Sequence, residues 1–379
     1  MVAVGPEDLS ERINVGLMYR PQGVVEGAAS RRSVRMARIV ARTLGAEPLL
    51  ARPVRGSTAR PLIHPIDPAV SQRITGHQVD LAVPGLARDL EGLARIQDRL
   101  ESVPTMHRLV LGDSRSLESV PDASVHLAIT SPPYWTLKRY TERDGQLGLI
   151  TDFDKFAAEL SKVWAECYRV LVPGGRLVIV VGDVCLSRRV HGRHRVVPLH
   201  SSIQMRCQEL GFDNLAPVIW YKIANATFEA DGNGAGFLGK PYEPNAVIKN
   251  DIEFVLMERK PGGYRKPDPT ARLRSVIPAD SHRAWFRQIW DDISGEPKAG
   301  HPAPFPLALA DRLVRMFSFV GDTVIDPFVG TGTTMIAAAR AGRNSIGVDI
   351  DPTYVRMAER RIRRELRALD AKRTLRVER

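Results

Sequence analysis

A short apolar segment that ends in two prolines is the feature that most constrains the fold of this chain. The run over residues 124–130 has the length and the β-branched content of a buried parallel strand. Pro132 and Pro133 follow it, and because proline cannot donate to a strand ladder they predict a stiff turn at the strand's carboxyl end. Open α/β sheets bind ligands at that edge. Residues 130–135 therefore predict an active-site loop; the alternative is a strand-ending turn that packs Tyr134.

Composition sets outer limits on what the chain can be. Its 379 residues are 44% hydrophobic, enough for one large or two modest domains. No apolar run is long enough to span a membrane and no signal peptide is evident, so we expect a cytoplasmic protein. The net charge of +11 favours a polyanionic partner. Cys167, Cys185 and Cys207 are widely spaced, which predicts free thiols and neither a disulfide framework nor a metal site.

Residues 1–103 form a basic N-terminal extension that is partly irregular. A rough helical stripe over Arg31–Leu44 carries five arginines and no acid. Its basic face is either solvated or a contact for phosphates. Residues 46–80 are rich in proline and arginine and resemble an extended linker. A second helical stripe, Leu86–Leu100, is expected to dock on the domain that follows.

From residue 105 onward, strand-like and helix-like segments alternate, which predicts a doubly wound α/β fold. Pro173-Gly174-Gly175 marks a turn between a helix and a strand, and residues 231–239 are a glycine-rich excursion between two later strands. The expected strands are residues 107–111, 124–130, 176–181, 216–221, 251–259, 323–325 and 344–348; the expected helices are residues 153–171, 201–210, 307–317 and 352–369.

A glycine-rich turn follows the strand at residues 323–325. It reads Asp326-Pro-Phe-Val-Gly-Thr-Gly-Thr-Thr334 and leads into a helix, which is the arrangement of nucleotide-binding sites. The spacing differs from the dinucleotide fingerprint, and no phosphate-loop lysine is present. The carboxylate of Asp326 suits a cationic ligand. Asp349 ends the next strand, 23 residues after Asp326, where an acid can accept hydrogen bonds from both hydroxyls of a ribose.

Together the two motifs resemble those of the S-adenosylmethionine-dependent DNA amino-methyltransferases, which modify cytosine N4 or adenine N6. Ser131-Pro132-Pro133-Tyr134 is similar to the catalytic motif and the turn at Asp326 to the cofactor motif. The catalytic motif comes first in this chain, which resembles the permuted order of the class called beta. Trp220 and Lys222 match a further family signature. The resemblance covers about residues 105–366.

The resemblance implies a mostly parallel, seven-stranded, circularly permuted sheet with an antiparallel last hairpin. It divides the chain into a catalytic half, residues 104–260, a small inserted recognition segment, residues 261–300, and a cofactor-binding half, residues 301–379. It implies S-adenosylmethionine as cofactor and no metal. The expected cofactor-binding residues are Asp113 (which is alternatively a helix N-cap), Phe305, Asp326, Pro327, Phe328, Gly330, Gly332, Thr333 and Asp349.

The expected chemistry follows from the substrate. The lone pair of an exocyclic amine is delocalised into the base ring, so the amine needs acceptors for its protons before it can attack a methyl group. Ser131 Oγ and the Pro132 carbonyl would supply them, with the loop stiffened by Pro133. Tyr134 is expected to stack on a base flipped out of the duplex.

Double-stranded DNA is the expected partner. The segment 261–300 mixes basic and aromatic residues, as nucleic-acid surfaces do. The residues expected to bind DNA are Arg272, Arg274, Arg283 and Arg287. The loop at residues 188–195 contains His191 and His194 but no carboxylate, so we expect it to touch DNA phosphates and not to bind a metal. A homodimer and a cognate restriction endonuclease are compatible with the resemblance.

The base expected to be methylated is cytosine, at N4, because family members with serine at the position of Ser131 mostly modify cytosine. Adenine N6 is the alternative, and a catalytically inactive DNA-binding regulator is a remote one. The chain lacks a catalytic Pro-Cys pair, which argues against methylation at carbon 5 of cytosine.

Overall fold

The computed structural model describes residues 76–100, 103–137, 140–222, 250–295, 306–369 and 373–379. Three sequence predictions lie outside these residues: the basic helix at Arg31–Leu44, the glycine-rich stretch at residues 231–239, and the role of Phe305.

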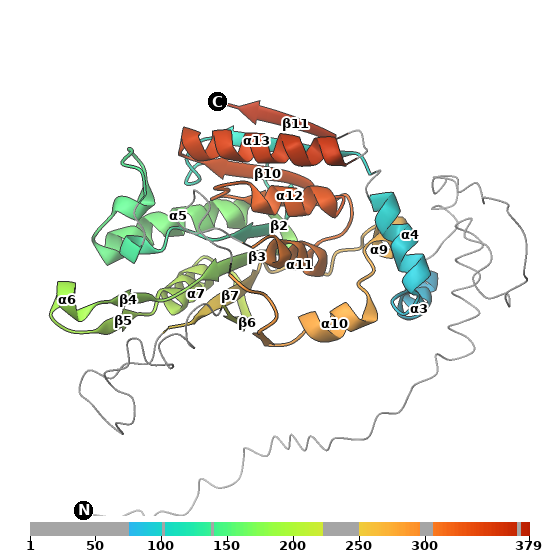
Figure 1. Ribbon diagram of the computed structural model, residues 1–379, viewed down its shortest axis with the longest axis horizontal. Coiled ribbons are helices and arrows are strands. Elements are labelled where there is room, and N and C mark those ends of the chain that lie inside the picture. The colour runs from blue at the N-terminus through green and yellow to red at the C-terminus, as the bar shows by residue number, and fades with distance from the viewer. Residues whose placement is uncertain (1–75, 101–102, 138–139, 223–249, 296–305, 370–372) are drawn as a thin grey trace, which may run out of the picture.

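A single twisted sheet forms the centre of the molecule (Figure 1). Its order is β11-β1-β10-β9-β2-β3-β7-β6-β8, and β7 is the strand that runs antiparallel to its neighbours β3 and β6. The predicted α/β fold, with a mostly parallel sheet and an antiparallel β6–β7 pair, is confirmed. The strands are β1 (Thr105–Leu111), β2 (Val125–Thr130), β3 (Leu171–Val181), β6 (Asp213–Tyr221), β7 (Ile252–Arg259), β8 (Ile289–Trp290), β9 (Thr323–Asp326), β10 (Asn344–Asp349) and β11 (Arg373–Glu378).

The expected number of seven strands was wrong, because the described residues alone form a sheet of nine strands. The two additional strands lie at its edges. The parallel strand β11 pairs with β1, and the two-residue strand β8 pairs with β6.

Helices cover both faces of the sheet, because its strands are apolar on both sides. Ala128 of β2 packs with α5 (Phe153–Val170) and α7 (Leu199–Glu209). Its neighbours Leu127 and Ile129 point to the other face and pack with α11 (Leu307–Phe317) and α12 (Thr333–Arg340). On that second face α13 (Pro352–Ala368) and α12 pack over Leu109 of β1, and Figure 1 shows α11, α12 and α13 lying over the sheet.

The order of the strands in space decides where the site lies. Although β9 and β10 follow β8 near the end of the chain, they lie between β1 and β2 in the sheet, and all four strands are parallel. The carboxyl ends of β1, β10, β9 and β2 therefore lie side by side at one edge of the sheet. This juxtaposition brings residues near 113, 131, 326 and 349 together, although more than 200 residues separate the first from the last.

Two helices that precede the sheet in the chain pack against residues 269–274 and away from this edge. The helix predicted at Leu86–Leu100 is present as α4 (Leu90–Leu100), whereas Leu86 ends a separate helix, α3 (Gly76–Leu86). The break occurs because Asp89 accepts a hydrogen bond from the backbone N–H of Gly92 and so starts a new helix. The linker expected over residues 46–80 must also be corrected, since residues 76–80 are helical. Val79 and Ala82 of α3 pack with Leu273 of α9 (Pro269–Arg274).

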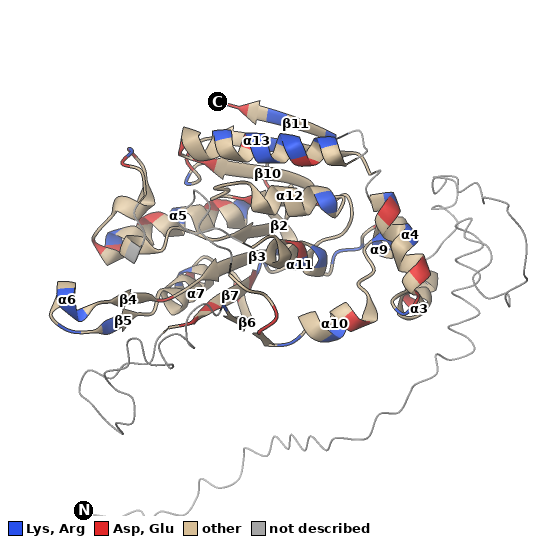
Figure 2. Cartoon of the chain, viewed as in Figure 1, with Lys and Arg blue, Asp and Glu red and all other residues tan. Residues whose placement is uncertain are grey.

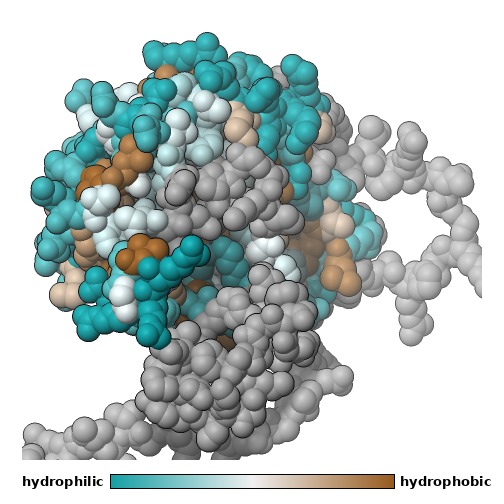
Figure 3. Space-filling model, turned by 60° about the vertical axis from the view of Figure 1, so that its left-hand side comes forward, coloured by the Kyte–Doolittle hydropathy of each residue, from teal (hydrophilic) through white to brown (hydrophobic). Residues whose placement is uncertain are grey.

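The basic loop predicted at residues 188–195 is the end of a small hairpin. It consists of β4 (Val184–Leu186), α6 (Arg188–His191) and the antiparallel β5 (Arg195–Val197). The hairpin leaves the sheet just after β3, and Figure 2 shows Lys and Arg residues, coloured blue, on α6 as well as on α13. In Figure 3 this side of the molecule is turned forward, and the described surface is largely hydrophilic with a few hydrophobic residues among the polar ones.

The remaining short elements are the 3-10 turns η1 (Trp135–Leu137) and η2 (Leu147–Leu149), and the helix α10 (Ala279–Trp285). In the part of the chain that the structure describes, no helix is both long and apolar enough to cross a bilayer.

Candidate active site

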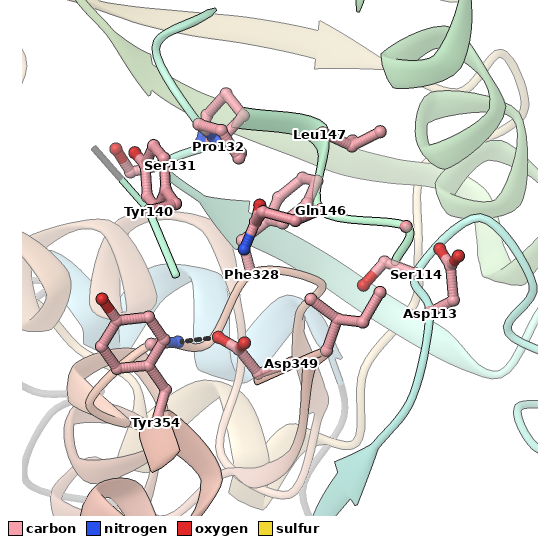
Figure 4. A pocket seen from close by; sticks show the side chains of 14 residues that line it. Asp113, Ser114, Ser131, Pro132, Tyr140, Gln146, Leu147, Phe328, Asp349 and Tyr354 are labelled. Carbon is pink, nitrogen blue, oxygen red and sulfur yellow. Dashed lines mark hydrogen bonds between the residues drawn. The ribbon is translucent and has the colours of Figure 1, made fainter. Parts of the chain in front are cut away.

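A cleft that is open to solvent lies at the carboxyl ends of these four parallel strands (Figure 4). Among the described residues that line it, the only charged side chains are those of Asp113 and Asp349. The cleft is therefore acidic in a chain whose net charge is +11, which suits a cationic ligand. It is lined by Asp113, Ser114, Ser131, Pro132, Pro133, Tyr140, Gly145, Gln146, Leu147, Phe328, Gly330, Asp349, Ile350 and Tyr354.

Asp349 sits at the end of β10 with its carboxylate fixed by two backbone N–H groups. Gly330 donates to Oδ2 over 3.0 Å and Asp351 donates to Oδ1 over 2.9 Å. Each oxygen keeps a lone pair for a further donor. Burial raises the pKa of this carboxyl to about 6, against the effect of the two hydrogen bonds. Asp349 is thus an ionised acceptor at neutral pH.

The glycine-rich turn comes close to β10 because glycine occupies both sides of the contact. Gly330 and Gly332 have φ values of +50° and +83°, which favour glycine. A Cβ at Gly347 of β10 would lie 2.5 Å from Met335 Sδ and 2.6 Å from Val329 Cγ2. The turn therefore lies directly on the strand, with the N–H of Val329 bonded to the carbonyl of Val348 over 2.9 Å.

Phe328 forms an apolar wall of the cleft and packs edge-on to Trp164 with 6.5 Å between ring centroids. The carbonyl of Pro327 accepts a hydrogen bond from the Ser114 hydroxyl, and this bond holds the turn to the loop after β1. Thr333, expected to touch the cofactor, is buried at the start of α12. Pro327, Gly332 and Thr333 thus shape the turn but do not line the cleft.

Asp326 does not line the cleft either. Its Oδ1 accepts hydrogen bonds from the Thr130 hydroxyl (2.8 Å) and the Phe328 N–H (3.1 Å), and its Oδ2 accepts from the Thr334 hydroxyl (2.7 Å). Its side chain is 6% exposed, and burial raises its pKa to about 6. Asp326 therefore joins the ends of β9 and β2 and the first turn of α12 beneath the site.

Asp113 lies in the cleft and is bound by Arg115. The Arg115 side chain reaches both carboxylate oxygens, and its backbone N–H donates to Oδ1 over 2.9 Å. These bonds outweigh desolvation and lower the pKa of Asp113. The alternative interpretation of Asp113 as a helix N-cap is wrong, because no helix lies between β1 and β2; Asp113 instead closes a turn with Arg115 and lies in the cleft.

The loop after β2, which the sequence predicts to be catalytic, places Ser131, Pro132 and Pro133 on the cleft but turns Tyr134 inward. The Tyr134 side chain is 5% exposed. Its hydroxyl accepts a hydrogen bond from Ser131 Oγ (3.1 Å) and donates to Glu253 Oε2 (3.1 Å) or to the Val180 carbonyl (3.3 Å). The expectation that Tyr134 stacks on a base needs correction, because its ring has no free face here.

Seven residues that were not predicted as site residues also line the cleft, and among them are the polar side chains of Tyr140, Gln146 and Tyr354. Figure 4 shows Tyr140 close to Ser131, and Tyr354 beside Asp349. A Cβ at Gly148 would lie 2.2 Å from the Tyr140 ring, so the ring packs on bare backbone. Tyr140 and Gly148 are close in the sequence, but this spacing alone is too weak a pattern to predict that Tyr140 lines the cleft.

The four arginines expected to bind DNA fall into two groups. Arg272 forms an ion pair with Asp80 of α3, and Arg274 is half-buried, which lowers the pKa of its guanidinium. Arg283 and Arg287 are exposed on and after α10, where Arg283 pairs with Asp280 over 3.0 Å. Arg272 and Arg274 are therefore partly buried, whereas Arg283 and Arg287 are exposed to solvent.

Within the residues that the structure describes, no group of three or more His, Cys, Asp or Glu side chains could hold a metal ion. The two histidines of the hairpin, His191 and His194, are both exposed.

Comparison with known proteins fits this geometry. A family model described as DNA methylase, that of the N6 and N4 methyltransferases, matches residues 125–360. This range spans more than half of the chain and includes both the catalytic loop and the glycine-rich turn. The chain belongs to this family of N6/N4 DNA methylases. The family resemblance drawn from the two motifs is thereby confirmed.

Individual members of the DNA methylase family match over most of their length. The type II methyltransferase M.MjaI of Methanocaldococcus jannaschii is 36% identical over 290 residues, which cover 69% of this chain and 92% of that protein. The DNA adenine methyltransferase YhdJ of Escherichia coli K12 is 28% identical over 273 residues, covering 67% and 82%.

A solved structure from Thermus thermophilus, described as that of a DNA modification methylase complexed with S-adenosyl-L-methionine, is 53% identical. It covers 72% of this chain and 98% of its own, with a TM-score of 0.59.

Proposed function

We propose that this DNA methylase transfers a methyl group from S-adenosylmethionine to N4 of cytosine in DNA. The observation that carries the proposal is the position of Ser131, a hydroxyl on a proline-stiffened loop that faces the same cleft as the Asp349 carboxylate. Adenine N6 is the alternative base, and the similarity to an adenine methyltransferase keeps it open.

The cleft fits the cofactor by its own chemistry. S-adenosylmethionine carries a sulfonium and an ammonium group, and the charged residues of the cleft are two carboxylates. Asp349 would accept hydrogen bonds from the ribose hydroxyls, and Phe328 would offer an apolar surface to the adenine. Asp113 would lie on the adenosine side, since its strand β1 is next to β10.

When bound, S-adenosylmethionine supplies an electrophilic methyl group. The chain's own contribution is to orient the amine. Ser131 Oγ and the Pro132 carbonyl would each accept a hydrogen bond from one amine N–H, which turns the nitrogen lone pair toward the methyl group. Asp326 supports this geometry indirectly, because it bonds Thr130, the residue before Ser131, over 2.8 Å.

The preference for cytosine rests on Ser131, because family members with serine at this position mostly methylate cytosine. Physical chemistry alone gives little preference between cytosine and adenine, since a hydroxyl can accept a hydrogen bond from the exocyclic amine of either base. We therefore propose cytosine N4 as the product position and treat adenine N6 as the outcome that would replace it.

DNA is proposed to lie against the edge of the sheet where the cleft opens. Arg189, Arg193 and Arg195 of the hairpin are exposed, and none of them forms an ion pair with another described residue. Exposed arginines without acidic partners suit phosphate binding. We also propose contacts from Arg283 and Arg287, whereas Arg272 and Arg274 would reach DNA only by giving up their places beside α3 and α4.

The experiment is to incubate the protein with S-adenosylmethionine labelled in its methyl group and unmethylated double-stranded DNA. Label should appear in the DNA. Since type II methyltransferases are among the relatives, only DNA that contains the recognised sequence should accept it. Genomic DNA of an expressing host, sequenced for modified bases, would identify that sequence. Absence of label from host-derived and synthetic DNA alike would overturn the proposal.

A further inference from the structure

Four polar side chains form a hydrogen-bonded chain behind the catalytic loop. Ser131 Oγ bonds to the Tyr134 hydroxyl (3.1 Å), which bonds to Glu253 Oε2 (3.1 Å), while Lys222 Nζ donates to Glu253 Oε1 over 2.6 Å. The loop after β2, the strand β7 and the end of β6 each supply part of it. Glu253 and Tyr134 are 8% and 5% exposed, so water has little access to the bonds between them.

The direction of the hydrogen bonds follows from the carboxylate end. An ionised Glu253, paired with Lys222, can only accept. Burial and the nearby Glu253 charge raise the pKa of Tyr134 well above its ordinary value, so the phenol keeps its one hydrogen. That hydrogen goes to Glu253 or to the neighbouring carbonyl of Val180. On its other side the Tyr134 oxygen is therefore an acceptor.

Ser131 must then donate its hydrogen backward to Tyr134, away from the cleft. The lone pairs of the Ser131 oxygen then face the cleft, so the hydroxyl can accept a hydrogen bond from an amine N–H. We propose that Glu253, held by Lys222, is a positioning residue that acts through Tyr134 to fix the Ser131 hydroxyl as an acceptor for the base. This inference rests on the proposed function and adds two residues to it.

Close packing leaves this arrangement little room to change. A Cβ at Gly182, at the end of β3, would lie 3.3 Å from Glu253 Cγ and 3.8 Å from Tyr134 Cε2. Trp220 anchors the end of β6 through a 2.8 Å bond from its Nε1 to the Ile293 carbonyl, and Lys222 Nζ lies 5.3 Å from the Trp220 ring. Both the acid and its cation are thus held in place.

Glu253→Gln tests the direction of the chain without changing its shape. Lys222 is only a donor, so the glutamine oxygen must face it and the amide NH₂ must face Tyr134. The amide then donates to Tyr134, and the direction at Ser131 is no longer fixed. We expect kcat to fall on the order of 10²-fold, with the dissociation constant for S-adenosylmethionine, the KM for DNA and the unfolding temperature unchanged.

A double variant distinguishes a loss of hydrogen-bond direction from a general structural defect. In Glu253→Gln/Lys222→Met the cation is gone, so the amide can turn its oxygen toward Tyr134 and restore the original direction. The double variant should be faster than Glu253→Gln by roughly threefold to tenfold, whereas two independent structural lesions would make it slower. Lys222→Met alone should lie between the wild type and the double variant.

The outcomes are distinct. Wild-type protein that transfers no methyl group to DNA overturns both the proposed function and this inference. Active wild type with a Glu253→Gln variant of undiminished kcat, or a double variant no faster than Glu253→Gln, overturns this inference alone. If Glu253→Gln fails to fold, Tyr134→Phe keeps the ring and removes the same link, and it must lower kcat while leaving cofactor affinity intact.

Discussion

Thr130 donates a hydrogen bond to Asp326 across 2.8 Å, and this bond joins the strand that carries the catalytic loop to the strand that carries the glycine-rich turn. Both side chains are buried, at 1% and 6% exposed. The acid that sequence reasoning assigned to the cofactor thus lies below the cleft and fixes the relative position of its two halves. Asp349, unlike Asp326, lines the cleft.

This relationship predicts a pH dependence of stability. The pKa of Asp326 is about 6 in the folded chain and near 3.8 when unfolded. The native state therefore holds a proton that the unfolded state has lost between these values, so stability falls as pH rises from about 4 to about 6 and is constant above. The contribution is about 3 kcal/mol. Denaturant unfolding at several pH values should show the decline in the wild type and a shallower one in Asp326→Asn; parallel curves for the two proteins would contradict it.

Asp349→Ala is expected to weaken binding of S-adenosylmethionine by about 1–3 kcal/mol, because it removes acceptors for the ribose hydroxyls. Asp349 protonates near pH 6, so wild-type affinity should also decline below that pH. Titration calorimetry measures both effects. A folded Asp349→Ala variant with wild-type affinity would exclude Asp349 from the cofactor site.

Gly347→Ala should destabilise the fold by about 1–3 kcal/mol, since its Cβ would overlap Met335 and Val329 and push the glycine-rich turn off β10. Gly263→Ala is the matched control, because a Cβ there meets nothing within 4 Å. Unfolding in urea compares the two. Equal midpoints for both variants would show that the turn can shift freely.

Replacing Arg189, Arg193 and Arg195 by glutamine should weaken DNA binding and lower its salt dependence. The slope of log K against log salt should fall by about 0.9 for each phosphate that the protein no longer binds. The matched control replaces Arg360, Arg364 and Arg367, three exposed arginines of α13. Binding isotherms at several salt concentrations would contradict the placement if the slope fell equally in both triple variants. An Arg283→Gln/Arg287→Gln variant tests the second proposed DNA-binding surface in the same assay.

Much of the fold could be predicted because many of its strands have a clear sequence pattern. The runs before Ser131 and Asp326 are short, apolar and followed by turn residues, and both became parallel strands of the sheet. The strand β11 was missed, because only Leu375 and Val377 of its six residues are apolar. The strand β8 was missed because two residues give no period at all.

The site was predictable where a motif carried it and not where distant residues complete it. Ser131, Phe328, Gly330 and Asp349 do share one cleft. Glu253 is 119 residues from Tyr134 and is one of two acids, with Glu258, in a strand that is otherwise mostly apolar. Nothing local reveals that its carboxylate sits under the catalytic loop. For the same reason the sequence could not tell that the Tyr134 ring turns inward.

The most direct test of the account compares wild-type protein with Ser131→Ala on the same unmethylated DNA, which is then digested to nucleosides and separated by mass spectrometry. We predict N4-methylcytosine from the wild type, and a loss of product in Ser131→Ala that exceeds any loss of cofactor affinity. N6-methyladenine without N4-methylcytosine would contradict the assignment of the base. A Ser131→Ala variant that methylates DNA at the wild-type rate would contradict the central claim that this hydroxyl orients the reacting amine.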